Sequence, residues 1–166
     1  MRCAFGPEAM GHAGEDHMIE LVVSYIHILA VMVMAACLSV EAMLLASHDG
    51  RNTAEDLGRA DITYFIAAAV VLLAGSIKLV VSSKGFMYFM TNPVFLAKVS
   101  LFFAAAAVSL IPTSRYGRWR TRAHMDTGFR IPAAEAHSTL RLVLIELVTI
   151  FTLQLLAVMM ARGVGG

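Results

Sequence analysis

ITYFIAAAVVLLAGSIKLVV, which occupies residues 62–81, contains one charged side chain, that of Lys78. A helix rises about 1.5 Å per residue, so this run is long enough to cross the roughly 30 Å of hydrocarbon in a bilayer. Within lipid, a helix is the form in which a single segment satisfies nearly all of its own backbone hydrogen-bonding groups. The run therefore predicts a membrane-spanning helix.

Three further apolar runs of bilayer length lie at about residues 18–46, 93–111 and 140–161. Of the 166 residues, 58% are hydrophobic and 15% are charged, and the mean hydropathy is +0.73, well above the value of a typical soluble domain. The sequence thus predicts an all-α fold, an integral membrane four-helix bundle over residues 18–163. Residues 1–17 are expected to form a flexible N-terminal tail.

Polar residues and prolines between the runs predict where the helices end. Residues 47–50 (Ser-His-Asp-Gly) place a glycine where a helix C-cap is expected, and Asp61 is placed to cap the second helix. Asn92 and Pro93 are typical of an N-cap followed by a first helical turn. Pro112 predicts the end of the third helix.

The longest predicted loop, residues 113–139, carries most of the arginine excess. Its basic and aromatic cluster is expected to contact anionic lipid headgroups, and consists of Arg115, Arg118, Trp119, Arg120 and Arg122. With Arg51, Arg59, Arg130 and Arg141, the first and third loops hold eight positive charges, against three (Arg2, Lys84 and Arg162) on the other side. The positive-inside rule therefore predicts that both termini are non-cytoplasmic.

Several classes of partner are not indicated by the sequence. A net charge of +1, without basic and aromatic residues interleaved along one element, predicts no nucleic-acid partner. Cys3 and Cys37 have neither the spacing of a metal site nor that of a disulfide framework, so no metal site is predicted. The lipid bilayer is the expected partner, and the sequence leaves open whether the chain forms a homo-oligomer.

An ionisable side chain near the centre of a spanning helix costs about 2.5 to 3.5 kcal/mol, so each one calls for a reason. In the first span Glu20, His27, Met34 and Glu41 recur every seven residues. They share one helix face, which is expected to turn toward the bundle. Two interpretations remain open for Glu20 and Glu41. Either they face the bundle with His27, or they lie near the two membrane interfaces and are hydrated there.

The polar residues of the spans fall into two layers. The inner layer consists of Glu41, Asp61, Arg141 and Glu146, and the outer layer consists of His27, Lys98 and Gln154. Charges of both signs in the inner layer are expected to compensate one another across the helices, so this layer is interpreted as structural. Lys98 either extends its ammonium group to the headgroups or shares a site with His27. His27 is either a metal or haem ligand or a side chain hydrogen-bonded to a neighbouring helix.

The order of motifs along the chain resembles a known family. Tyr25-Ile26-His27 is followed by Glu41, by Lys84-Gly85 through Tyr88, by Asn92-Pro93, by Phe95-Leu96-Ala97-Lys98, and by Arg141 and Glu146 in the last span. Over about residues 20–163, these motifs resemble the bacterial predicted membrane proteins grouped as domain-of-unknown-function family 2214. The resemblance implies the four-helix architecture and a place in the bacterial inner membrane, and it implies no particular activity.

The chain is more distantly similar to the HemJ-type protoporphyrinogen IX oxidases, small helical membrane proteins that bind haem. A first-helix histidine and a third-helix lysine are functionally important in that family, and His27 and Lys98 match them by position. Glu146 matches an acidic residue of the last helix, but Ile145 and Val148 replace the Asn and Pro that flank it, and the first-helix tryptophan and arginine are absent. The similarity therefore implies haem binding more strongly than porphyrinogen oxidation.

Two functions are consistent with these patterns. The first is a haem- or porphyrin-associated membrane redox protein, with His27 as an axial ligand of haem b and Lys98 as a second ligand or a partner for a propionate. The second is a transport or scaffold subunit without a cofactor, in which the same polar residues line a pathway or fix helix packing. Neither pattern identifies a catalytic residue or a substrate.

Overall fold

The computed structural model describes residues 7–47, 53–81, 86–126 and 128–163. Within these residues the chain is almost entirely helical and contains no strand, which confirms the all-α prediction. The helices are α1 (Pro7–Ser47), α2 (Thr53–Val81), α3 (Phe86–Thr91), α4 (Pro93–Met125) and α5 (Ala133–Ala161).

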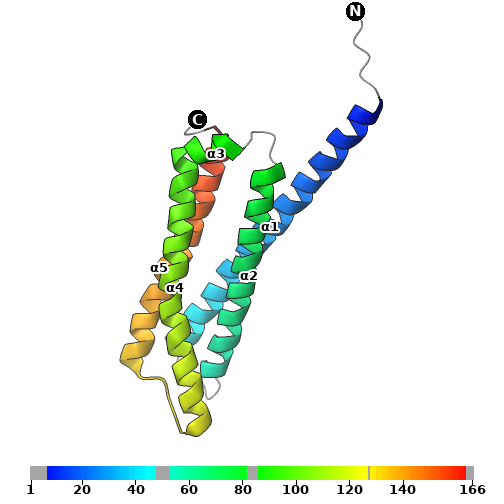
Figure 1. Cartoon of the computed structure of the whole chain (residues 1–166). Coiled ribbons are helices and arrows are strands. Elements are labelled where there is room, and N and C mark those ends of the chain that lie inside the picture. Colours follow the sequence, from blue (N-terminus) through cyan, green and yellow to red (C-terminus); the bar gives the residue numbers. More distant parts are fainter. Residues whose placement is uncertain (1–6, 48–52, 82–85, 127, 164–166) are drawn as a thin grey trace, which may run out of the picture.

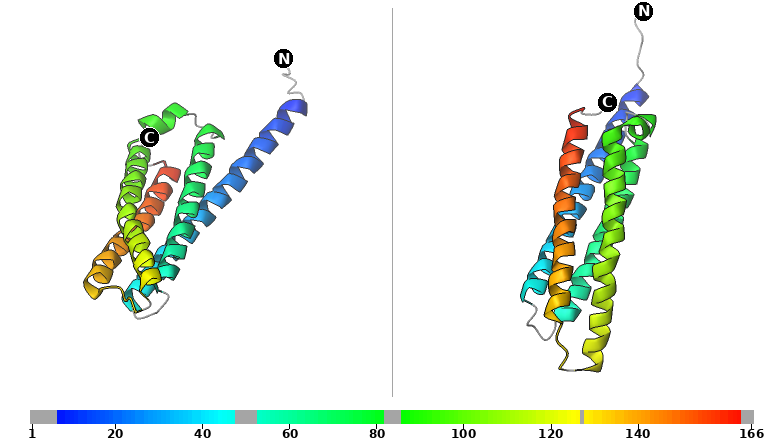
Figure 2. Two further views of the ribbon diagram at one scale, coloured as in Figure 1. Left: turned by 60° about the horizontal axis from the view of Figure 1, so that its bottom comes forward. Right: turned by 90° about the vertical axis from the view of Figure 1, so that its left-hand side faces the viewer.

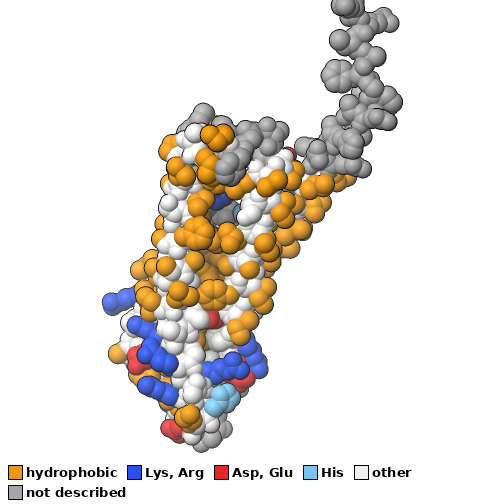
Figure 3. Space-filling model, viewed as in Figure 1, with side chains coloured by type: hydrophobic (Ala, Val, Ile, Leu, Met, Phe, Trp, Pro, Cys, Tyr) orange, Lys and Arg blue, Asp and Glu red, His pale blue; other side chains and the backbone are white. Residues whose placement is uncertain are grey.

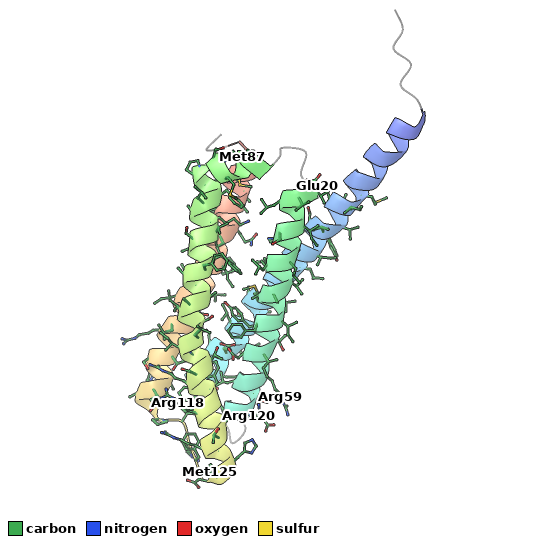
Figure 4. All side chains as sticks on the ribbon, in the orientation of Figure 1. Glu20, Arg59, Met87, Arg118, Arg120 and Met125 are labelled. Carbon is green, nitrogen blue, oxygen red and sulfur yellow. The ribbon has the colours of Figure 1, made fainter. Side chains whose placement is uncertain are left out.

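The four long helices run alternately in opposite directions, and each packs against two others (Figure 1). α1 and α4 each pack on both α2 and α5, which gives the order α1, α2, α4, α5 around the bundle (Figure 2). The short helix α3 lies at the end of the bundle where α5 ends, and the first part of α1 leans away from α2 and projects past this end. We call it the α3 end, and we call the opposite end, where Arg59, Arg118 and Arg120 lie, the basic end (Figure 4).

The outer surface of the bundle is apolar over most of its length. The exposed fractions of Val80 and Met43 are 84% and 72%, and hydrophobic atoms cover the middle of the molecule in Figure 3. Four helices are long and apolar enough to cross a membrane, over Met18–Ser47, Thr53–Val81, Pro93–Met125 and Ala133–Met160. Exposed apolar surface of this extent suits lipid and not water. The prediction of an integral membrane four-helix bundle is confirmed.

The core contains one face of each long helix. On α1 the buried residues include Ala30, Met34, Leu38, Glu41 and Leu45, which recur every three or four positions. This is the spacing of a single helix face, so the same periodicity that buries the apolar residues also brings the glutamate inside.

Aromatic and polar side chains of α4 join it to α5 at the basic end. Tyr116 and Trp119 are each 1% exposed, and their ring centroids lie 5.7 Å apart. The indole Nε1 of Trp119 donates a hydrogen bond of 2.8 Å to Oε2 of Glu135. Arg115 donates from Nη1 to the hydroxyl oxygen of Thr139 over 2.8 Å. These contacts fix the start of α5 against the second half of α4.

α2 extends beyond the bounds predicted from hydropathy. It begins at Thr53, so the prediction of Asp61 as an N-cap is wrong, and Asp61 instead lies within the helix and is buried. The additional turns bury Ala54 and Leu57 and carry acidic residues in the first turn, where the helix dipole favours them. Hydropathy marks the part of a helix that lies in lipid. The helix itself extends further here, because its first turns bury apolar side chains against the bundle.

α4 continues through Pro112 to Met125, so the prediction that this proline ends the helix is wrong. A proline inside a helix removes one backbone hydrogen bond and costs about 3 kcal/mol. Burial of Tyr116 and Trp119 beyond it offsets that cost, since full burial of a large apolar side chain contributes about 1.5 to 3 kcal/mol. Most of the loop predicted at residues 113–139 is therefore helical, and the connection is the segment between Met125 and Ala133.

The N-cap of α4 is as predicted. The side-chain Oδ1 of Asn92 accepts hydrogen bonds from the backbone N–H groups of Val94, at 2.9 Å, and Phe95, at 3.2 Å. Pro93 occupies the first turn, where its missing N–H has no consequence.

α1 begins at Pro7, so residues 7–17 of the predicted tail are helical, and the flexibility of the tail stays a prediction. A helix that has already formed extends at low cost per residue, which allows it to continue beyond the apolar segment. Residues 1–6 of the predicted tail, and Gly50 of the predicted C-cap, lie outside the described residues.

We predict that the basic end of the bundle faces the cytoplasm. The exposed arginines gather at this end, and the positive-inside rule places such an excess on the cytoplasmic side. Alkaline phosphatase fused after Gly166 is expected to be active and a green fluorescent protein fused there to be dark, with the reverse for fusions after Gly128. A fluorescent C-terminal fusion together with an inactive phosphatase fusion would contradict the orientation.

Candidate functional site

Three carboxyl groups from three different helices meet inside the half of the bundle nearer the basic end. Glu41 of α1, Asp61 of α2 and Glu146 of α5 are 2%, 8% and 3% exposed. Asp61 and Glu146 both lie within electrostatic range of Glu41. We call these three residues the acid cluster.

Hydroxyl groups of α4 face the acid cluster. The phenol of Tyr116 donates a hydrogen bond of 3.1 Å to Oε2 of Glu41, and the hydroxyl of Thr113 donates one of 2.9 Å to Oδ1 of Asp61. The other carboxylate oxygen of Glu41, Oε1, is buried and has no hydrogen-bond partner. Oε1 of Glu146 is buried and unpartnered as well. The cluster thus contains more acceptor atoms than the surrounding hydroxyls satisfy.

Arg141 does not join this cluster, and the prediction that it compensates the inner carboxylates is wrong. Its side chain is exposed, and the ion pairs within the described part of the chain are those of Arg59 with Glu55 and Asp56. Arg141 and Glu146 are five residues apart, which separates them by about 140° around a helix. When Glu146 faces the core, Arg141 must therefore point away from it.

Gln154 also lies apart from the acid cluster. It follows Glu146 by eight residues, which is about 12 Å along the helix toward the α3 end, and it is half-buried. Of the five residues predicted to form an intramembrane polar network, the structure therefore brings together Glu41, Asp61 and Glu146 and leaves out Arg141 and Gln154.

His27 is the centre of a second polar group, nearer the α3 end. Its Nδ1 lies 3.1 Å from the backbone carbonyl oxygen of Val71 on α2. A carbonyl oxygen only accepts hydrogen bonds, so Nδ1 carries the proton and donates it. In the neutral form of the ring, Nε2 is then unprotonated and has a lone pair. His27 precedes Glu41 by fourteen residues, so the two polar groups are about 21 Å apart along α1.

Two lysines accompany His27. Lys78 of α2 and Lys98 of α4 are half-buried and lie within electrostatic range of its imidazole ring. Neither lysine forms an ion pair with an acidic residue within the described ranges. The surface is hollowed between α2 and α4 near the α3 end, and Lys or Arg atoms are visible in the hollow in Figure 3. We call His27, Lys78 and Lys98 the basic cluster.

The arginines of the basic end divide into two groups. Arg115 is partly buried and donates to hydroxyls of α5, whereas Arg118, Arg120 and Arg122 are exposed. A shallow pocket of about 420 Å³ opens on this surface and is lined by Ser114, Gly117, Arg118, Thr121 and Arg122. The second group alone is free to meet lipid headgroups.

The hydroxyl groups that donate to the carboxylates were not predicted from the sequence. Tyr64 is 4% exposed, and it lies within electrostatic range of all three acids. A usable signal was present, because Ser109, Thr113 and Tyr116 recur at spacings of four and three residues and so share one helix face. The prediction that the helix ends at Pro112 excludes Thr113 and Tyr116 from that face.

Four apolar helices of bilayer length that enclose buried ionisable side chains define a polytopic α-helical membrane protein. The family model described as a predicted membrane protein, DUF2214, matches residues 19–165, which is nearly the whole chain. The chain therefore belongs to the DUF2214 family. No curated protein and no solved structure matches it. The more distant resemblance to HemJ-type oxidases stays a prediction.

We predict that Tyr116→Phe destabilises the protein by about 1 to 3 kcal/mol, because it removes the hydroxyl that Glu41 accepts from and leaves that acceptor buried. Thermal unfolding in detergent measures the change. Tyr25→Phe is the matched control, since Tyr25 is 66% exposed and its hydroxyl faces the outside of the bundle. Equal stability of the two variants would show that the Tyr116 hydrogen bond contributes nothing.

We also predict that Arg141 and Glu146 are uncoupled, because their side chains point in different directions from α5. The stabilities of Arg141→Ala, Glu146→Gln and the double variant are expected to add within about 0.5 kcal/mol. A larger coupling free energy in this double-mutant cycle would restore an ion pair between them.

Proposed function

We propose that the protein binds haem b or a related porphyrin at the basic cluster and takes part in membrane redox chemistry, with His27 as an axial ligand. The observation that carries this proposal is the hydrogen bond from Nδ1 of His27 to the carbonyl oxygen of Val71. Histidines that ligate metals almost always donate their other ring N–H to a carbonyl or a carboxylate, which fixes the tautomer and the direction of the ring. His27 meets that requirement with Nε2 available for coordination.

The charges around His27 support an anionic ligand. Lys78 and Lys98 place two ammonium groups near the ring, and no described acidic side chain forms an ion pair with either. Burial of unpaired like charges is unfavourable, so a ligand with negative charge would stabilise this arrangement. A haem carries two propionates on an otherwise apolar macrocycle. Lys98 would serve as a propionate partner or as a second ligand, as the more distant resemblance also implies.

Bound haem supplies one-electron chemistry, and the chain supplies the environment. The carbonyl of Val71 fixes a proton on Nδ1 and the orientation of the imidazole, and the apolar faces of the surrounding helices exclude water. The two lysines hold negative charge at the α3 end of the bundle. On this proposal the protein resides in a bacterial inner membrane with both termini non-cytoplasmic, and Arg118, Arg120 and Arg122 contact anionic lipid headgroups.

A transport or scaffold subunit without a cofactor is the second candidate. The observation that favours it is that α1, α2, α4 and α5 all contribute half-buried or buried ionisable groups, arranged in two layers along the bundle. Groups of this kind inside a membrane mark ion or substrate pathways and proton relays as well as ligand sites. In that case His27 would serve as a hydrogen-bond donor that holds α1 to α2.

We predict that the protein purified from haem-replete cells shows a Soret band that shifts on reduction. His27→Ala is expected to abolish the band while the protein still expresses and folds, because the variant removes the ligand nitrogen. His124→Ala is the matched control, since this exposed histidine lies at the basic end of α4 and should leave the spectrum unchanged. A colourless wild-type protein that also fails to take up added haemin would overturn the proposal and favour the second candidate.

Lys98→Met separates ligand binding from packing. It keeps the length and the apolar volume of the side chain and removes the charge. If Lys98 meets a propionate or the iron, the variant lowers haemin affinity or shifts the Soret band, whereas a lysine that only extends to the headgroups leaves both unchanged.

A further inference from the structure

The acid cluster brings three carboxyl groups together without a cation. Glu41 and Glu146 are 2% and 3% exposed, and each has a buried carboxylate oxygen with no hydrogen-bond partner. Arg141 points away from them, and no Lys, Arg or His of the described ranges forms an ion pair with any member of the cluster. Three ionised carboxylates that are buried and within electrostatic range of one another would repel one another in a medium of low dielectric constant.

The groups that face the cluster from each helix are acids or weak proton donors. The titratable groups within electrostatic range of Glu41 are Cys37 on α1, Asp61 and Tyr64 on α2, Tyr116 on α4, and Glu146 on α5. None of them carries a positive charge at neutral pH. The negative charge must therefore be removed by a ligand that comes from outside the chain, and that ligand is either a metal ion or a proton.

The geometry favours the proton. The described residues contain no group of three or more His, Cys, Asp or Glu side chains arranged to hold a metal ion. The hydroxyls of Tyr116 and Thr113 direct their hydrogens at Glu41 and Asp61, which is the arrangement of a carboxyl network and not of a metal coordination shell. Two nearby acids in an apolar site hold a proton because they cannot both ionise there.

We propose that Glu41 and Glu146, with Asp61 beside them, form a reversible proton-binding site in the membrane interior. Oε2 of Glu41 accepts from Tyr116, so the proton is carried by Oε1, the unpartnered atom. Uptake joins a proton from water to one carboxylate oxygen and leaves a neutral carboxylic acid, and release is the reverse. The site is about 21 Å from His27 along α1, so it does not depend on haem binding.

Infrared spectroscopy of the full-length protein in lipid vesicles tests this site. At neutral pH the wild-type protein is expected to show the C=O stretching band of a protonated carboxylic acid, which shifts in heavy water and weakens as the pH is raised. Glu41→Gln and Glu146→Gln are each expected to lower the band, and the double variant to abolish it. Absence of the band at neutral pH, or its persistence in the double variant, would overturn the proposal.

Glu55→Gln is the matched control, because Glu55 lies on the surface of α2 in an ion pair with Arg59 and should not contribute to the band. Thermal stability gives a second readout that does not rely on assigning a band. Glutamine mimics a neutral glutamic acid, so Glu41→Gln is expected to keep or raise the melting temperature at neutral pH. A large loss of stability, with the control unchanged, would show that Glu41 must be ionised and would overturn the proposal as well.

Discussion

A bilayer supplies no water to the backbone, and this constraint governs the whole structure. Each segment in lipid must satisfy its own N–H and C=O groups, so the chain crosses as four helices that carry their apolar side chains outward. The hydrophobic effect then does little to hold the helices together, because lipid is as apolar as the core. Specific contacts have to do so, and the polar ones include the bonds of His27 with Val71, Tyr116 with Glu41 and Thr113 with Asp61. The polar residues of the two candidate sites therefore also hold the helices in position against one another.

The second half of α4 shows how the ends of the bundle support its interior. Because the helix passes through Pro112, Tyr116 reaches Glu41 and Trp119 reaches Glu135. Had the helix ended at the proline, Glu41 would lack the phenol that donates to it and α5 would lose its contact with Trp119 at the basic end. The proline costs about 3 kcal/mol, and those contacts together with the burial of the two aromatic rings offset it.

The interior of the bundle contains basic side chains at one height and acidic side chains at another. Toward the α3 end His27 is accompanied by two lysines, and toward the basic end three carboxyl groups gather without a cation. The chain does not bring these opposite charges together, since about 21 Å of α1 separates them. Among the described residues, neither group forms an ion pair with a side chain of opposite charge. On the proposals made above, negative charge suits the first and protons suit the second.

Hydropathy and helical periodicity, read from the sequence, determined that the chain is an all-α membrane bundle and that Asn92 caps α4. They placed Glu41 on one face with His27 and Met34 but left open whether it is buried or hydrated, and the structure buries it. Those features are local, because a bilayer selects segments by length and polarity alone. Only the tertiary structure decided that Asp61 lies inside α2, that Arg141 faces outward, and that α4 passes through Pro112. Periodicity states which residues share a face, but it does not state how each helix is rotated relative to its neighbours. That rotation is set by packing between helices distant in sequence, and it left the acids together and the arginine outside.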